Sequence, residues 1–148
     1  MKIRRAFKED IPRLCCIEEK CRFCPKWGEK GFKREFENRV SVTIVLEEKG
    51  KVQGFANFWL LSDSVDLNYI AVVKEMRRRL AGSKLVEKVI EYARKNGCRW
   101  INLEVNRENL PAVAFYEKIG FEKAGIRPKF YNNQYDALLM KFEVKDEN

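Results

Sequence analysis

The feature that most constrains the fold is a strand, an amphipathic helix and a second strand between Val65 and Val105. Runs of β-branched and apolar residues predict strands over Ser64–Val73 and Trp100–Val105. Gly97 ends the helix between them. The apolar face of this helix repeats at helical spacing and consists of Leu85, Val86, Val89, Ile90 and Ala93. One helix between two strands of a sheet makes those strands parallel through a right-handed crossover.

Shorter strands and helices surround this crossover. In chain order the sequence predicts a strand, two helices, three strands, a helix, a strand, a helix and two strands. Outside the crossover these elements are expected at Lys2–Phe7, Asp10–Glu18, Lys30–Asn38, Val40–Glu48, Val52–Leu61, Asn109–Lys118, Phe121–Ala124 and Ala137–Val144. Asp10 is a candidate N-cap, and Pro12 follows it in the first turn. We expect a single α/β domain over residues 1–148.

Parallel crossovers bind ligands at the carboxyl ends of their strands, which here means after Val73 and after Glu104. The first place is followed by a basic loop, Arg77–Ser83, that opens the central helix. A helix N-terminus presents unpaired N–H groups and a positive dipole, which suit a phosphate. The adjacent Arg77, Arg78 and Arg79 add charge complementary to a pyrophosphate. From these residues alone, an ordinary helix cap remains the alternative.

Charge and composition narrow the partners and the compartment. The chain has 30 Lys and Arg against 22 Asp and Glu, a formal charge of +8. This excess favours polyanionic partners, such as a phosphorylated cofactor or a ribosome, but its interleaving with acidic residues gives no reason to expect specific nucleic-acid binding. The sequence shows neither a signal-peptide pattern nor a run of about 18 apolar residues, so we expect a cytoplasmic protein that does not enter membranes.

The cysteines are concentrated near the N-terminus. The chain has five cysteines and no histidine. Four of the cysteines lie within ten residues: Cys15, Cys16, Cys21 and Cys24. Because no histidine or second C-x-x-C completes a usual zinc ligand set, we expect no metal and favour free structural thiols, with a disulfide as the alternative.

Several motifs resemble one known family. Ile70-Ala71-Val72 and then Arg77-x-x-x-x-Gly82 are similar to the acetyl-CoA motif of the GNAT superfamily, Gln/Arg-x-x-Gly-x-Gly/Ala. Other motifs resemble the RimI type of that superfamily and run almost from end to end. They are Ile17-Glu18-Glu19, Phe23-x-Pro25-x-Trp27, Leu103-Glu104-Val105, Asn109, Ala114–Phe121, and a tail containing Arg127, Phe130, Tyr131, Asn133, Asp136, Ala137 and Met140.

The resemblance implies a fold, a co-substrate and an acceptor. The GNAT fold is a mixed, mostly antiparallel sheet with one parallel strand–helix–strand crossover and flanking helices. The co-substrate is acetyl-CoA, and the RimI type transfers its acetyl group to the α-amine of a protein N-terminus, such as that of a ribosomal protein. By resemblance the residues that bind acetyl-CoA are Ile70, Ala71, Val72, Arg77, Arg78, Arg79, Leu80, Ala81, Gly82, Ser83, Asn109 and Tyr116.

Glu104 and Tyr116 are the catalytic candidates. Strand alternation places Glu104 on the face opposite Leu103 and Val105, at the carboxyl end of its strand. Without the resemblance a solvated carboxylate would explain it; with the resemblance it is the general base. Tyr116 matches the general acid and lies about 100° around its helix from Phe115, although a partly buried structural tyrosine would look the same.

Two positions depart from the family pattern. Leu80 stands where the acetyl-CoA loop usually has its first Gly. If the loop requires a positive φ there, leucine costs about 1–2 kcal/mol. Gln134-Tyr135 stands where Gly-Glu is usual, in a segment that borders the acceptor in relatives, so the acceptor preference is open.

Two other functions remain as alternatives. A small-amine acetyltransferase, acting on a polyamine or an aminoglycoside, would need an acidic pocket, which the positive charge of the chain does not favour. A basic module that binds CoA or the ribosome without turnover is the other, and Leu80 keeps it open. Cys98 has no histidine partner, so a cysteine nucleophile has no support.

Overall fold

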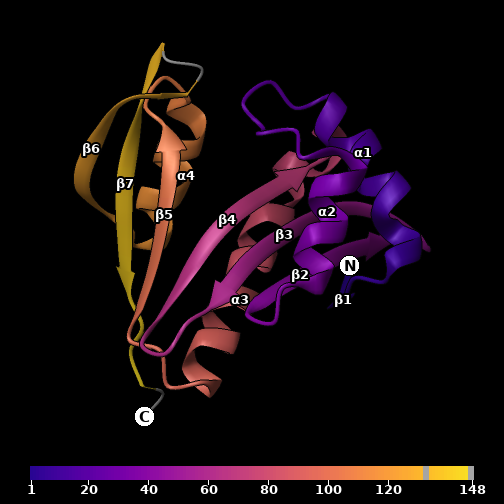
Figure 1. The fold of residues 1–148 in the computed structure, drawn as a ribbon, viewed down its shortest axis with the longest axis horizontal. Coiled ribbons are helices and arrows are strands. Elements are labelled where there is room, and N and C mark those ends of the chain that lie inside the picture. Colours follow the sequence, from indigo (N-terminus) through magenta and orange to yellow (C-terminus); the bar gives the residue numbers. More distant parts are fainter. Residues whose placement is uncertain (132–133, 147–148) are drawn as a thin grey trace.

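The fold is built on one mixed sheet of seven strands in the order β1-β2-β3-β4-β5-β7-β6 (Figure 1). The computed structural model describes residues 1–131 and 134–146, except the side chains of Arg78, Phe130 and Tyr131. The strands are β1 (Lys2–Arg5), β2 (Ser41–Glu48), β3 (Lys51–Leu60), β4 (Ser64–Val72), β5 (Trp100–Asn106), β6 (Glu122–Tyr131) and β7 (Tyr135–Glu143). Of the neighbouring pairs in the described residues, β4–β5 is parallel and the others are antiparallel, as the sequence predicted.

Helices cover both faces of this sheet (Figure 1). They are α1 (Ile11–Glu19), α2 (Gly28–Glu37), α3 (Ala81–Lys95) and α4 (Leu110–Ile119), with short 3₁₀ helices η1 (Lys8–Asp10) and η2 (Lys74–Arg79). One buried cluster joins α3 and α4 to the sheet and includes Leu85, Val89 and Tyr116. A second joins α1 and α2 to the other face and includes Leu14, Phe32 and Phe55. The apolar stripe that predicted the central helix is therefore the stripe that packs on the sheet.

The largest difference from the predicted elements is β6. We expected a strand over Phe121–Ala124, whereas β6 runs over Glu122–Tyr131. The pairing of β6 with β7 continues past register shifts after Lys123 and Arg127. Because the extra residues are held by pairing with β7 and not by their own pattern, local periodicity underestimates the strand.

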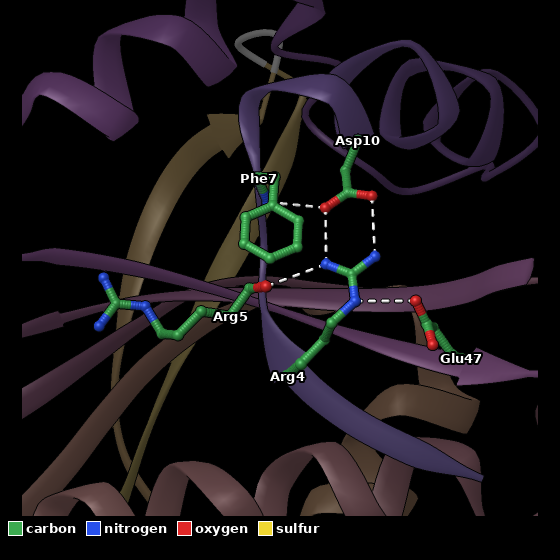
Figure 2. Close-up of polar contacts among 5 residues, drawn as sticks. All are labelled: Arg4, Arg5, Phe7, Asp10 and Glu47. Carbon is green, nitrogen blue, oxygen red and sulfur yellow. Dashed lines mark hydrogen bonds and ion pairs between the residues drawn. The ribbon is translucent and has the colours of Figure 1, made fainter. Parts of the chain in front are cut away.

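The prediction that Asp10 caps α1 is wrong as regards its side chain. Asp10 occupies the N-cap position, but its backbone is helical and its side chain makes no cap hydrogen bond there. Its carboxylate accepts instead from the Phe7 N–H at 2.7 Å and from the Arg4 guanidinium at 2.8 and 3.0 Å (Figure 2). Arg4 Nε also donates to Glu47 at 2.8 Å. The carboxylate thus ties β1 to the start of α1, and Arg4 extends the tie to β2.

The prediction of free thiols is wrong for two of the four clustered cysteines. Cys21 and Cys24 form a disulfide in the segment between α1 and α2. Cys15, Cys16 and the buried Cys98 remain thiols. In the described residues no group of three or more His, Cys, Asp or Glu side chains is arranged to hold a metal ion. The turn that follows α1 brings the two sulfurs together, and C-x-x-C spacing alone does not distinguish this from free thiols.

We expect this bridge to stabilise the oxidised protein by about 2 kcal/mol, the value for a very short closed loop in the chain-entropy model. The double substitution Cys21→Ser/Cys24→Ser should lower the free energy of unfolding in urea by that amount. Dithiothreitol supplies the control, because it should remove the difference between the two proteins. Equal stability under oxidising conditions would contradict a bridge that constrains the unfolded chain.

Candidate active site

The site begins where β4 and β5 separate (Figure 1). Their parallel pairing covers only Ser64–Leu67 against Trp100–Leu103. At that point a bulge leaves Asn68 of β4 without an opposite residue on β3, since Asn57 pairs with Tyr69 and Phe58 with Leu67. A bulge bends its strand and increases its twist. The carboxyl-terminal half of β4 therefore turns away from β5, which opens the sheet.

The bulge also exchanges the two faces of β4. Before it, Val65 and Leu67 are buried in the cluster on the α3 side. After it, Tyr69 and Ala71 are buried in the cluster on the α1 side, while Ile70 and Val72 pack against the α3 side. The extra residue shifts the alternation by one position, which reverses every later side chain.

The separated part of β4 has backbone groups directed toward the opening. Val73 N donates to Gln53 O of β3 at 2.9 Å, so alternation directs the peptide groups of Ile70 and Val72 to the other edge of the strand. Arg77 Nε donates to Val72 O at 3.2 Å, in agreement with that direction. The pairing of β4 with β5 ends at Leu67, so these N–H groups have no ladder partner on β5. They are donors at an open sheet edge.

In the basic loop after β4, Leu80 has the positive φ on which the predicted cost of a leucine at this position depended. Leu80 has φ +63° and ψ +18°, and α3 begins at the next residue. Gly82 follows in the first turn, where an added Cβ would lie 3.2 Å from Cζ of Phe115 in α4. A leucine in the left-handed conformation is unfavourable. The glycine at position 82 permits close packing of α3 on α4. The N-terminus of α3 thus follows a strained turn, with Leu80 exposed and Ala81 buried.

The arginines of the loop that were predicted to bind the cofactor differ in their contacts. Arg79 is paired with Glu48 of β2 at 3.1 Å, and Arg77 contacts Val72 O. The side chain of Arg78 lies outside the described residues. Ala81 is fully buried, and Ser83 is partly exposed in the first turn of α3. The Arg77 and Arg79 side chains are therefore held by a backbone carbonyl group and by Glu48, and they do not form a row of free cations.

Replacing Leu80 by Gly should stabilise the protein. The left-handed conformation costs a leucine about 1–2 kcal/mol, and the greater flexibility of glycine in the unfolded chain offsets part of that gain. Leu80 is 66% exposed, so the substitution removes little packing. We expect a rise of about 1 kcal/mol in the free energy of unfolding, measured in urea. Leu80→Ala is the control and should show no gain, because alanine keeps the strain. A less stable glycine variant would contradict strain at this turn.

One cleft of about 900 Å³ connects the opening of the sheet with the face covered by α1 and α2. Glu104, Asn109, Tyr116 and Ile70 all line it, so the structure brings together four residues that the sequence singled out. The other walls come from the segment between α1 and α2, including Cys21, Cys24 and Trp27, and from β6 and β7, including Arg127 and Lys141.

Glu104 lies on the predicted face of β5. Buried and partly exposed residues alternate along this strand, and the Glu104 side chain is 29% exposed. Its Oε1 is 2.7 Å from Nη2 of Arg127 on β6. The sequence did not predict this pairing, although Arg127 belongs to the tail motif. Asn133 of that motif lies outside the described residues, as do the side chains of Phe130 and Tyr131.

Tyr116 is more buried than the sequence suggested. It is 6% exposed and packs edge-on against Phe115 and Phe121, at centroid distances of 5.1 and 5.4 Å. Phe115 and Ile119, four residues apart on the same helix, are only partly buried. The Tyr116 ring therefore belongs to the core and also lines the cleft. Asn109 caps α4, since its Oδ1 accepts from Ala112 N at 3.3 Å.

The sequence also missed the anchor of the wall between α1 and α2. Glu18 is buried and accepts from Trp27 N, Gly28 N and the Tyr69 hydroxyl at 2.7–2.8 Å. Burial and this hydrogen bond raise the pKa of Tyr69 well above its ordinary range, so its hydroxyl stays a donor. Lys26 Nζ adds bonds to the carbonyl groups of Glu18 and Cys21, both at 3.0 Å. In the sequence, this wall was indicated only by the resemblance to the RimI type at Ile17-Glu18-Glu19 and Trp27.

The comparison with protein families agrees with this arrangement. The acetyltransferase (GNAT) family matches residues 11–121, which include the opened strands, the loop and the catalytic candidates. The chain belongs to the GNAT acetyltransferase family. It is accordingly an acetyl-CoA-dependent N-acetyltransferase.

The relatives of this GNAT enzyme include alanine N-acetyltransferases of a ribosomal protein. It is 32% identical over 138 residues to the [ribosomal protein bS18]-alanine N-acetyltransferase of Escherichia coli (strain K12), covering 91% of this chain and 92% of the relative. The crystal structure of the ribosomal-protein-S18-alanine N-acetyltransferase from Escherichia coli superposes with a TM-score of 0.88 at 29% identity, covering 99% and 96% of the two chains. The structure of yncA from Salmonella typhimurium with its cofactor acetyl-CoA, at 20% identity and a TM-score of 0.80 over 100% and 96%, shares the fold.

Two further observations complete the description of this GNAT enzyme. Among the described residues, no helix is both long and apolar enough to cross a membrane. Of the two residues that depart from the family pattern in this part of the chain, Gln134 is exposed, and Tyr135 opens β7 with 39% of its surface exposed.

Proposed function

We propose that this enzyme transfers the acetyl group of acetyl-CoA to the α-amine of a protein N-terminus, with a ribosomal protein as the expected acceptor. The observation that supports this most is the presence of a carboxylate, Glu104, and a phenol, Tyr116, in one cleft beside the unpaired edge of β4. The relatives named above supply the acceptor class. Ribosomal proteins are made in the cytoplasm, so the expected compartment is unchanged.

The described residues fit acetyl-CoA. The N–H groups of Ile70 and Val72 lie at an open strand edge, which suits the amide and thioester oxygens of an extended pantetheine. The N-terminus of α3, from Leu80 to Ser83, suits the pyrophosphate. Gly82 keeps a side chain out of the contact with Phe115. Asn109 and Tyr116 would border the same molecule from α4.

The chemistry needs a base, a hydrogen-bond donor and an acid. Acetyl-CoA supplies the activated acetyl group, and CoA leaves as the thiol. Glu104 takes the proton of the amine through a water molecule while the new N–C bond forms. The N–H groups near Ile70–Val72 hold the carbonyl oxygen as it gains charge. Tyr116 gives a proton to the sulfur as the C–S bond breaks. No residue forms a covalent intermediate.

The basicity of the amine favours an N-terminus over a lysine side chain. An α-amine has a pKa of about 7.7–8.0, against about 10.4 for lysine. Near neutral pH an α-amine is therefore roughly 10–20% uncharged, whereas deprotonating a lysine costs about 3–4 kcal/mol more. A single carboxylate acting through water suits the weaker base.

A small polyamine is the second candidate, because the cleft has an acidic side. Glu35 of α2 and Asp66 of β4 line it together with Glu104. These carboxylates would attract a polycation, although Arg127 and Lys141 line the same cleft and oppose it.

The experiment is thiol release from acetyl-CoA with short peptides that differ only at residue one. Each peptide is also tested with a blocked N-terminus, and spermidine is tested beside them. We expect turnover only with a free peptide N-terminus. Turnover with spermidine alone would replace the proposal with the small-amine enzyme. If no acceptor reacts, while acetyl-CoA still raises the melting temperature, the chain is a binding module.

A further inference from the structure

The proposed base is held by a cation from a strand that does not pair with its own. Glu104 lies on β5 and Arg127 on β6, and β7 lies between them. Their contact, Oε1 to Nη2, is 2.7 Å, with the side chains 29% and 53% exposed. Exposed ion pairs contribute little to stability, so stability alone does not account for this one. Its position in the cleft points to the reaction.

The register across the three strands explains how Arg127 reaches Glu104. Glu104 is opposite Leu139 on β7, and Leu139 is opposite Gly125 on β6. The next row on the same face contains Asn106, Ala137 and Arg127. Neighbouring strands lie about 4.8 Å apart, so two strand spacings separate the backbones of Arg127 and Glu104. The small residues Gly125 and Ala137 leave a path for a long side chain to cross β7 diagonally.

A second carboxylate, that of Asp136, connects the segment after Glu104 with the segment after Arg127. Asp136 Oδ1 accepts from Lys129 N at 2.9 Å, just after Arg127, and Asp136 Oδ2 is 3.2 Å from Arg107 Nη1. Arg107 N also donates to Asp136 O at 2.9 Å, just after β5. The hydrogen bond from Lys129 N holds the pKa of Asp136 below its ordinary value. The segments that follow Glu104 and Arg127 are therefore tied together, and the ion pair is set before a substrate arrives.

The geometry divides the two carboxylate oxygens of Glu104. Arg127 contacts Oε1. A carboxylate held through one oxygen can direct the other, Oε2, toward an acceptor amine or its bridging water. The other titratable or charged side chains that line the cleft with this pair are Glu35, Asp66, Tyr69, Tyr116 and Lys141.

We propose that Arg127 is a positioning residue for the acetyl transfer: it holds Oε1 of Glu104 so that Oε2 faces the acceptor amine. This inference rests on the proposed role of Glu104 as the base. Arg127 itself contacts the base and not the reacting atoms. Its removal should affect the chemical step more than the binding of acetyl-CoA or of the acceptor.

The test compares Arg127→Gln and Arg127→Lys with the wild-type enzyme on the best acceptor of the panel above, whichever amine that is. We expect Arg127→Gln to lower kcat about tenfold or more, with KM for both substrates within about twofold. Arg127→Lys should restore most of kcat, because its ammonium group can still hold Oε1 of Glu104. Lys95→Gln, which removes the exposed Lys95–Glu91 pair of α3 (3.2 Å), is the matched control and should behave as wild type.

Two results would overturn the inference. One is a Gln variant whose kcat matches the wild type. The other is a fall in kcat that is accompanied by a large change in KM and is not rescued by lysine, which would indicate a structural role. Thermal unfolding of both variants checks that they are folded. A wild-type enzyme that acetylates only spermidine would overturn the proposed acceptor, while the comparison of the Arg127 variants would still decide this inference.

Discussion

Glu104→Gln is expected to lower kcat for peptide acetylation by about 100- to 10,000-fold, the usual contribution of a positioned general base. Glutamine keeps the size and the hydrogen-bonding shape of the side chain but does not accept the amine proton. Because Glu104 is 29% exposed and on the cleft wall, the substitution should leave the fold intact. The measurement is the initial rate of thiol release with a free-N-terminal peptide across a range of pH.

A matched substitution and a binding measurement separate catalysis from structure. Glu108→Gln, in the loop that follows β5, should leave the rate unchanged. Acetyl-CoA should still raise the melting temperature of Glu104→Gln, since the proposed pantetheine contacts come from β4 and α3. A Gln variant within about tenfold of the wild-type rate would remove Glu104 from the role of base.

Glu18→Ala should be the most destabilising substitution near the site. Removal of the carboxylate leaves Trp27 N, Gly28 N and the Tyr69 hydroxyl without their acceptor. Glu18 is 3% exposed, so water does not replace the lost bonds easily. A buried donor left without a partner costs about 1–3 kcal/mol, so three of them predict a loss of roughly 3 kcal/mol or more in the free energy of unfolding.

The neighbouring Glu19 offers the control, because it is exposed and Glu19→Ala should change stability by less than about 0.5 kcal/mol. Urea unfolding measures both variants. The wall between α1 and α2 lines the cleft, so Glu18→Ala should also raise KM for the peptide more than KM for acetyl-CoA. Equal stability of the two alanine variants would show that the Glu18 network does not support this wall.

The helices and strands, and the face of β5 on which Glu104 lies, were predictable because they depend on residues that are near neighbours in the chain. The buried residues of β5 alternate, and those of α3 repeat at helical spacing, and both patterns are visible in the sequence. Leu80 was recognisable as an exception for a similar reason, since its neighbours match a loop that has glycine at that position. Its φ of +63° agrees with that interpretation.

The partners inside the site were not predictable in this way. Tyr69 is 51 residues from Glu18, and the diagonal contact between Glu104 and Arg127 depends on the register of β5, β7 and β6. The bulge at Asn68 has no periodic signal, because one extra residue looks like ordinary strand sequence. The disulfide shares its spacing with free thiols and metal sites, so only the turn after α1 distinguishes them.

The sequence by itself therefore determined the parallel crossover, the basic loop before α3, and the strand face that presents Glu104. These follow from periodicity over a few residues and from the backbone chemistry of a helix N-terminus. Only the tertiary structure decided that the sheet opens after Leu67, that Tyr116 and Glu104 line one cleft, and that Arg127 holds the carboxylate. Those features depend on strand register and on contacts between distant segments, which form only when the whole sheet is assembled.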